Sequence, residues 1–271
     1  MFRRLLLFTI TVLLLFPSVM GQKQKARHTF FPGPSDFYID GAPFQLISGE
    51  LYPSRIPADY WSHRIRMAKA MGCNTITATI FWNFYETDEG VFDFVEGNRN
   101  LMLFFQMVKN EGMWLLLKPG PFVSDGWDAG GIPAYITGNP EVVPGDATFM
   151  KAAERYIKQL SALLKPLQIT NGGPLLMIQL DDQYGSRGDD PEYLEKIRDM
   201  WISNGINVSF FTNDVPERDA LKKGTLKGCI TGLSDFAGQE DLQTAQEINP
   251  GLPVIVSLPT GKVTVWGGEE E

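Results

Sequence analysis

Short apolar segments and amphipathic segments alternate along most of this 271-residue chain. The apolar segments predict strands at residues 44–51, 74–81, 113–118, 175–180, 208–212, 229–233 and 253–257. The amphipathic segments between them predict helices at residues 58–71, 98–111, 148–167, 192–204, 218–224 and 241–249. Repeated strand–helix units imply parallel strands, and this many units in one domain favour an α/β fold with a TIM-type (β/α) barrel.

The same order of elements also suits an open, doubly wound sheet. No glycine-rich dinucleotide fingerprint follows the first predicted strand, so the barrel is favoured. The chain provides seven predicted strands, and we expect the barrel to lack its eighth strand–helix unit. The first and seventh strands would then be open edges, which favour self-association.

The first residues predict an export signal. Arg3 and Arg4 precede an apolar run at residues 5–16, and small residues follow before Gln22. This order is typical of a secretory signal peptide, predicted here at residues 1–21, with the incomplete barrel domain at residues 22–271. A membrane anchor is the alternative, but a span needs about 20 apolar residues. We expect an exported protein that has no membrane association after signal cleavage.

The charge balance and the rare residue types exclude several classes of function. Loss of the two arginines with the signal peptide moves the formal net charge from −8 to −10, which argues against nucleic-acid binding. His28 and His63 are the only histidines, too few to favour a histidine metal site or a serine–histidine triad. Cys73 and Cys229 fall across the predicted barrel, so we expect two free, buried thiols.

Aromatic and polar residues gather where the predicted strands end, and barrel enzymes carry their chemistry at that face. A sugar pocket needs rings for the apolar faces of the sugar and polar groups for its hydroxyls. Trp82, Phe122, Trp127 and Tyr184 either serve such a pocket or only pack the barrel mouth, and the pattern leaves both interpretations open. By contrast, three tryptophans at helical or strand-start positions are predicted core residues: Trp61, Trp114 and Trp201.

Several motifs occur in a fixed order along the chain. They are Ile47-Ser48-Gly49-Glu50, Arg55-Ile56-Pro57, residues 67–72, Phe81-Trp82-Asn83, Lys118-Pro119-Gly120-Pro121, residues 127–133 and residues 167–174. Together they resemble the family 35 glycoside hydrolases of the β-galactosidase type, collinearly from about residue 37 to residue 267. The resemblance implies a (β/α)₈ barrel that removes terminal β-linked galactose with retention, and it implies no metal or organic cofactor.

The resemblance also shows where catalytic groups are expected, and both positions are substituted. Retaining hydrolysis needs a carboxylic acid and a carboxylate nucleophile about 5 Å apart. The family's acid, the second glutamate of a Glu-Asn-Glu-Tyr-Gly run, falls at Gln183. Its nucleophile, a glutamate after a serine, falls at Leu258, which follows Ser257. Glutamine has no proton to give at neutral pH, so the sugar-cleaving machinery is predicted to be lost.

The positions that contact the sugar in the family have changed as well. The family's tyrosine on the second strand falls at Thr79, the glutamate of its Cys-Ala-Glu-Trp run at Gly126, and the asparagine beside its acid at Asp182. Its His-Glu pair reads Tyr85-Glu86. By position, the resemblance assigns these residues to substrate binding: Thr79, Trp82, Glu86, Gly126, Trp127, Asp182 and Tyr184.

Three hypotheses follow. The favoured one is a degenerate hydrolase that at most binds a β-galactoside or a related glycan. The second is an active hydrolase with substitute carboxylates, such as Asp182 with Glu86 or Glu50, although Asp181 and Asp182 can point to opposite faces of a strand end. The third is a truncated gene product without a function of its own. The candidate site residues differ from the family's, while the barrel motifs around them are still recognisable. This pattern fits a repurposed non-catalytic protein and an inactivated enzyme equally.

Overall fold

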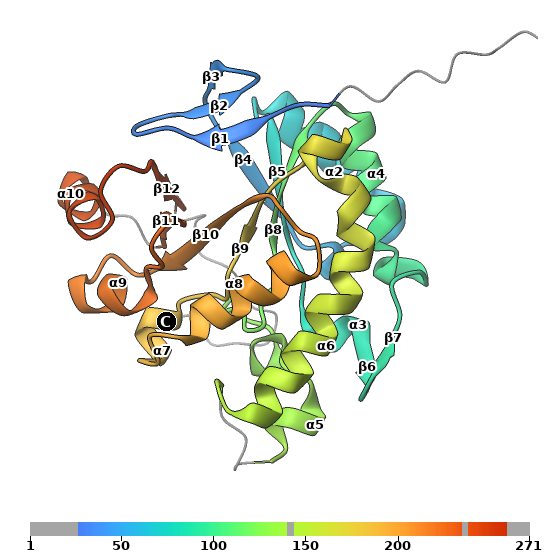
Figure 1. Cartoon of the computed structure of the whole chain (residues 1–271). Coiled ribbons are helices and arrows are strands. Elements are labelled where there is room, and N and C mark those ends of the chain that lie inside the picture. Colours follow the sequence, from blue (N-terminus) through green and yellow to red (C-terminus); the bar gives the residue numbers. More distant parts are fainter. Residues whose placement is uncertain (1–26, 140–143, 235–237, 259–271) are drawn as a thin grey trace, which may run out of the picture.

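In the computed structural model, seven parallel strands form a curled sheet with helices along its outer side (Figure 1). The structure describes residues 27–139, 144–234 and 238–258. The strands lie in chain order: β4 (Ser48–Leu51), β5 (Thr75–Thr79), β8 (Trp114–Lys118), β9 (Leu175–Gln179), β10 (Ser209–Asp214), β11 (Ile230–Leu233) and β12 (Val254–Val256). A doubly wound sheet would reverse its strand order partway, so the predicted barrel architecture is confirmed.

All six predicted helices are present, with bounds shifted by at most a few residues. They are α2 (Ala58–Ala70), α4 (Leu101–Asn110), α6 (Ala147–Leu164), α8 (Tyr193–Ser203), α9 (Arg218–Gly224) and α10 (Gln239–Ile248). Helix α6 begins where the Asp146 carboxylate accepts a hydrogen bond from the Phe149 backbone N–H at 2.7 Å, which satisfies one free donor of the first turn. Its apolar residues recur at helical spacing and pack against the sheet.

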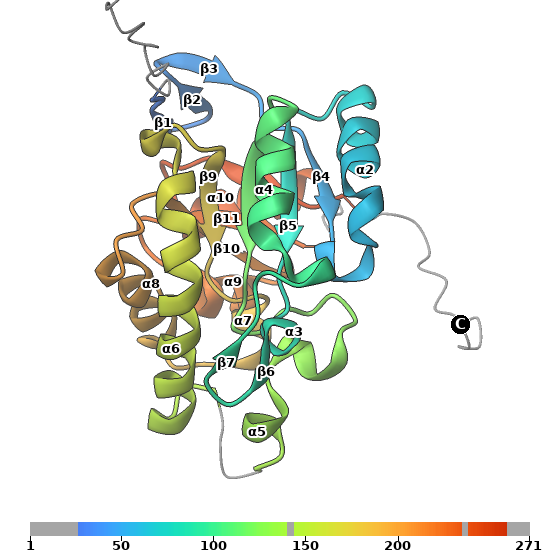
Figure 2. The same ribbon diagram turned by 90° about the vertical axis from the view of Figure 1, so that its right-hand side faces the viewer.

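Several short elements were not predicted. An antiparallel sheet of β1 (Phe30–Pro32), β2 (Phe37–Ile39) and β3 (Ala42–Phe44) precedes the barrel strands. After the strands come helices α3 (Trp82–Tyr85), α5 (Ala134–Thr137) and α7 (Tyr184–Arg187), and the hairpin of β6 (Glu86–Asp88) and β7 (Val91–Phe92). Figures 1 and 2 show the β1–β3 sheet at one end of the barrel and these later elements at the other.

The first predicted strand was too long at its amino-terminal side. Phe44 pairs with Phe37 in the antiparallel sheet, so residue 44 belongs to β3, and the barrel strand starts only at Ser48. A turn at Asp40 and Gly41, both with positive φ, joins β2 to β3. Three-residue strands are too short to show a period of two in the sequence, which explains why this sheet was missed.

The two faces of the curled sheet differ in character. On β8, Leu115 and Leu117 pack into the cluster under the outer helices, whereas Leu116 packs on the inner side with Met177 and Phe211. Lys118 continues the inner row at the end of the strand. Side chains alternate between the faces of a strand, so the barrel interior is apolar near the strand starts and polar at their ends.

Among the described strands, β4 and β12 each have one neighbour, and the gap between them is called the seam here. Self-association through these two edges stays a prediction. The two cysteines are free; Cys229 is buried, while Cys73 is partly exposed, so the expected burial holds for only one of them. The predicted signal peptide lies outside the described residues. Within the described ranges, no helix is both long and apolar enough to span a bilayer.

The loop before β9 requires a glycine. A Cβ at Gly173 would lie 1.9 Å from the carbonyl oxygen of Leu167, a contact that only a backbone shift would relieve. We expect Gly173→Ala to destabilise the fold by more than about 2 kcal/mol, as overpacking of a rigid contact does. The change is measured as the shift of the urea midpoint at an unchanged slope.

The control is Gly238→Ala. Nothing lies within 4 Å of an added Cβ at Gly238, and its φ of 169° is extended backbone. We expect this control to shift stability by less than about 1 kcal/mol. Equal midpoints for the two variants would contradict the close approach at Gly173.

Candidate functional site

Five inward-facing polar residues form a ring at the carboxyl ends of the first five barrel strands. This polar ring consists of Glu50, Thr79, Lys118, Gln179 and Asn213. The Thr79 hydroxyl donates to Glu50 Oε1 at 2.6 Å, and Lys118 Nζ donates to the same oxygen at 2.9 Å. The first three strands are thus joined at the barrel mouth by one carboxylate.

Lys118 is the positive centre of the site. Its ammonium contacts Glu50 at 2.9 Å and Asp125 Oδ2 at 3.0 Å, and only 12% of its side chain is exposed. Burial alone would lower the pKa of Lys118, but the charges of Glu50, Asp182 and Asp125 outweigh burial and raise the pKa well above its ordinary value. Lys118 therefore stays charged and cannot act as a base.

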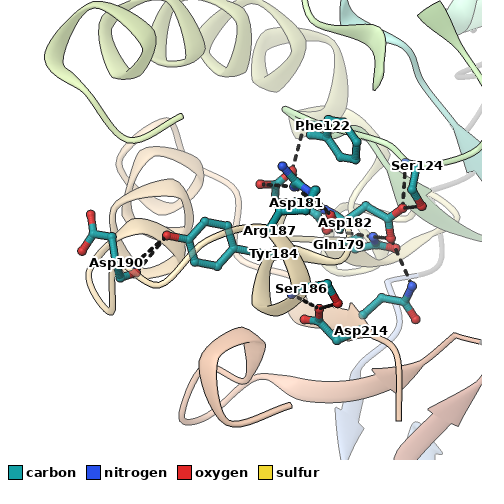
Figure 3. A network of polar contacts seen from close by, with 11 residues as sticks. Phe122, Ser124, Gln179, Asp181, Asp182, Tyr184, Ser186, Arg187, Asp190 and Asp214 are labelled. Carbon is teal, nitrogen blue, oxygen red and sulfur yellow. Dashed lines mark hydrogen bonds and ion pairs between the residues drawn. The ribbon is translucent and has the colours of Figure 1, made fainter. Parts of the chain in front are cut away.

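The two neighbouring aspartates after β9 point in different directions (Figure 3). Asp181 Oδ1 accepts from the Phe122 N–H at 2.8 Å, and its Oδ2 pairs with Arg187 at 3.1 Å. Asp182 faces the polar ring: Oδ1 accepts from Gln179 at 2.7 Å and from Asn213 at 3.0 Å.

Asp182 also holds the loop that follows β8. Its Oδ2 accepts from the Ser124 N–H at 2.9 Å and from the Ser124 hydroxyl. Burial would raise the pKa of this carboxyl, but Lys118 and the hydrogen bonds from Ser124 and Asn213 hold the pKa below its usual value. Asp182 is therefore an anion at neutral pH, already surrounded by donors, and it has no proton to give.

Gln183 and Leu258, the substituted catalytic positions, both lie at carboxyl ends of strands. Gln183 follows β9 in a left-handed conformation with φ 49°, and its side-chain amide lies 3.4 Å from the Ser234 hydroxyl. Leu258 follows β12, lines the barrel opening and is 70% exposed. Neither side chain is ionisable, so neither position supplies an acid or a nucleophile.

Trp82 and Glu86 lie behind the site. Trp82 is fully buried and stacks on Tyr156 with ring centroids 5.0 Å apart, and its indole N–H donates to Glu86. Glu86 also accepts from the Gly90 N–H at 2.6 Å and pairs with Arg155 at 3.2 Å. Both residues are committed to packing between the hairpin and α6, so the assignment of Trp82 and Glu86 to substrate contact has no support in this geometry.

Of the other assigned positions, Tyr184 is buried, whereas Trp127 is half-buried and Gly126 is exposed. Tyr184 is 5% exposed and stacks on Tyr193, with its hydroxyl at Asp190, so it packs rather than faces the opening. Trp127 is half-buried in a stack with Phe81, at 4.3 Å between centroids. Gly126 is exposed, and no atom lies within 4 Å of a Cβ built there, so the place of the family's glutamate is open space.

Arg55 fixes the loop that carries Asp125 and Gly126. It donates to the backbone carbonyls of both residues at 2.8 Å. Its guanidinium also lies over the rings of Tyr52 and Trp127, at 5.0 and 5.4 Å from their centroids. The loop after β8 is therefore held from one side by Arg55 and from the other by Asp182.

Asp214 is a buried carboxyl at the end of β10. Its Oδ1 accepts from the Ser186 N–H at 3.2 Å, while Oδ2 has no hydrogen-bond partner among the described residues. A Cβ at Gly224 would lie 1.7 Å from that oxygen, so α9 approaches it closely. Burial raises the pKa of Asp214 from 3.8 to about 7, against the opposing backbone donors of Gly185 and Ser186.

A cleft of about 950 Å³ enters the barrel interior along the seam. Residues of the two edge strands line it, as do Glu50, Lys118, Gln179 and Asn213 of the polar ring. Sequence reasoning had not singled out Lys118, Gln179 and Asn213 as site residues. Their positions at the ends of three consecutive strands were the available signal.

The comparisons of sequence agree on one family. The sequence profile described as glycosyl hydrolases family 35 matches residues 36–271. A β-galactosidase of Xanthomonas manihotis is 36% identical over 214 residues, covering 78% of this chain and 35% of that protein. Beta-galactosidase 17 of Arabidopsis thaliana is 31% identical, covering 93% and 38%. The chain spans about two-fifths of the length of the curated relatives it matches.

Solved structures share the fold. The exo-β-1,4-mannosidase Op5Man5 from Opitutaceae bacterium strain TAV5 superposes with a TM-score of 0.53 at 15% identity, covering 72% of this chain and 38% of that one. The GH5_18 protein of Streptomyces cattleya, solved with GlcNAc, gives 0.57 at 12% identity, covering 71% and 51%. At these identities the likeness concerns the barrel alone.

The raised pKa of Asp214 predicts a pH-dependent stability. The folded state holds this proton more tightly than the unfolded chain does, so the contribution is fully present below about pH 4 and is lost as the pH rises through about 7. We expect the free energy of unfolding to fall by about 2–4 kcal/mol over that range relative to Asp214→Asn, since one pKa unit corresponds to about 1.4 kcal/mol.

Urea unfolding at a series of pH values measures this difference. Asp219→Asn, at an exposed carboxyl on the same helix as Gly224, is the matched control and should follow the unmodified protein. Parallel pH profiles for the unmodified protein and Asp214→Asn would contradict a neutral carboxyl at this position.

Proposed function

The chain belongs to glycosyl hydrolases family 35, and from this we propose that it is a β-galactosidase-like protein that binds a glycan without hydrolysing it. We further propose that the mature chain is exported and that its ligand is a β-galactoside. The relatives named above are β-galactosidases, and the polar ring offers donors and acceptors of the kind that sugar hydroxyls need.

One observation carries the proposed loss of catalysis. Gln183 and Leu258 stand at the acid and nucleophile positions. Asp182, the carboxylate next to Gln183 in sequence, already accepts hydrogen bonds from Ser124, Gln179 and Asn213. General acid catalysis contributes about 10²–10⁴-fold, and a depressed pKa at Asp182 removes that contribution at neutral pH.

The other carboxylates are poor substitutes. Glu86 is buried against Trp82 and Arg155, out of reach of the cleft. Glu50 and Asp125 both pair with the Lys118 ammonium, at 2.9 and 3.0 Å, so each already has a cationic partner. These contacts support the inactive interpretation over an active enzyme with substitute carboxylates.

Catalytic silence is tested with nitrophenyl β-galactoside, whose activated leaving group needs little protonation. We expect no release of nitrophenol above the buffer rate. Gln183→Glu alone should not restore turnover, because Leu258 still supplies no nucleophile and Gly126 and Thr79 do not replace the lost sugar contacts. Turnover by the unmodified chain that disappears in Asp182→Asn would instead establish the substitute-carboxylate mechanism.

Glycan binding is tested separately by titration with methyl β-galactoside, followed by ligand-detected NMR. We expect saturable binding that weakens at least about 10-fold in Glu50→Gln, because loss of one charge-assisted hydrogen bond costs about 1.5–3 kcal/mol. Glu192→Gln, at an exposed position before α8, is the control and should bind as the unmodified chain does. Absence of binding in the unmodified chain would remove the proposed function.

A further inference from the structure

The cleft at the seam contains two chemically different parts. At the carboxyl ends of the strands it is lined by the polar ring. Deeper in the barrel it is lined by Leu46, Leu116, Phe211 and Ile255, from four different segments. Its volume of about 950 Å³ lies at the upper end of the range of about 300–1,000 Å³ for small-molecule pockets. A single sugar ring at the polar ring would therefore leave the deeper part unfilled.

Gln179 lies between the polar and the apolar part of the cleft. Its side-chain oxygen accepts no hydrogen bond from the described residues. Its amide N–H groups are committed to Asp182 Oδ1 and to the Asp181 carbonyl, both at 2.7 Å. Its Oε1 is buried and has no hydrogen-bond partner among the described residues, and the side chain is 2% exposed. A buried acceptor without a donor costs about 1–3 kcal/mol, so a hydroxyl delivered here by a ligand would be strongly favoured.

The deeper part has apolar surface that a sugar cannot cover. Leu46 and Ile255 are only partly buried, and Ile47, 44% exposed, also lines the cleft. Sugar hydroxyls placed against these side chains would lose their hydrogen bonds with water and gain none. Hydrocarbon suits this surface, because it loses no hydrogen bonds there and removes apolar area from water.

We propose that the cleft binds an amphiphile, a β-galactoside-like head carrying an unbranched hydrocarbon chain. The head donates a hydroxyl to Gln179 at the polar ring, and the chain runs into the barrel interior along Leu116, Phe211 and Ile255. This inference rests on the proposed function for its head group, and it adds the apolar aglycone as the feature that sets affinity.

A polypeptide strand is the rival occupant of the seam, since β4 and β12 each have a neighbour on one side only among the described strands. Pairing with these edges would satisfy their backbone groups. The unpaired acceptor, however, belongs to Gln179 on β9, in the middle of the sheet, which backbone pairing at the seam does not reach. The amphiphile accounts for both the orphan acceptor and the apolar lining.

The experiment titrates the full chain calorimetrically with methyl, butyl, hexyl and octyl β-galactoside, each below its micelle concentration. We expect Kd to fall about two- to four-fold for each added methylene until the deeper part is filled. In Ile255→Asn the dependence on chain length should disappear while methyl β-galactoside binds as before. Leu103→Asn, an exposed apolar position on α4 outside the cleft, is the matched control and should keep the full dependence.

The possible outcomes separate the two proposals. Equal Kd values across the series overturn the amphiphile and leave the proposed glycan binding intact. Tighter binding of longer chains without any binding of the methyl galactoside supports the hydrocarbon site and removes the sugar-binding function. A dimer seen by sedimentation that excludes octyl β-galactoside identifies polypeptide as the occupant and overturns the inference. If Ile255→Asn fails to fold, the chain-length series on the unmodified protein still shows whether a longer hydrocarbon chain strengthens binding.

Discussion

The carboxylate of Asp182 connects the parts of the barrel mouth that would otherwise be independent. It accepts hydrogen bonds from the end of β9 through Gln179, from the end of β10 through Asn213, and from the loop after β8 through Ser124. Lys118 lies close enough to lower its pKa. The arrangement uses the charge of Asp182 to hold structure, and a charge used in this way is not available for proton transfer.

Other charged side chains at the barrel mouth are held by structural contacts in the same way. Glu50 and Asp125 meet at Lys118, and Asp181 is held by Arg187 and the Phe122 N–H. Both Asp181 and Gln183 have positive φ, a strained backbone that these contacts must maintain. The carboxylates and the Lys118 ammonium at the barrel mouth are thus paired with one another or with protein donors.

The barrel was predictable because its signal is long-range and repetitive. Seven apolar segments separated by amphipathic helices leave few alternatives, and residues such as Leu160 and Tyr156 on α6 repeat at helical spacing over five turns. The site was predictable only in part. Motif position identified Asp182 and Thr79, which the structure places at the barrel mouth, but it could not reveal that Trp82 and Glu86 turn away into the core. The pairing of Lys118 with Glu50 and Asp125 forms only when the chain folds, and no sequence pattern indicates it.

The inner and outer faces of the curled sheet have different roles in the fold. The large hydrophobic cluster lies between the strands and the outer helices and includes Trp61, Phe104, Tyr156 and Trp201. Trp82 and Tyr184 extend this cluster toward the barrel mouth, whereas the polar ring lies outside it. Substitutions of polar ring residues therefore leave this cluster intact, so the chemistry of the inner face can change while the helical shell keeps its packing. The residues that hold the helices on the sheet and those that line its polar opening are thus largely different sets.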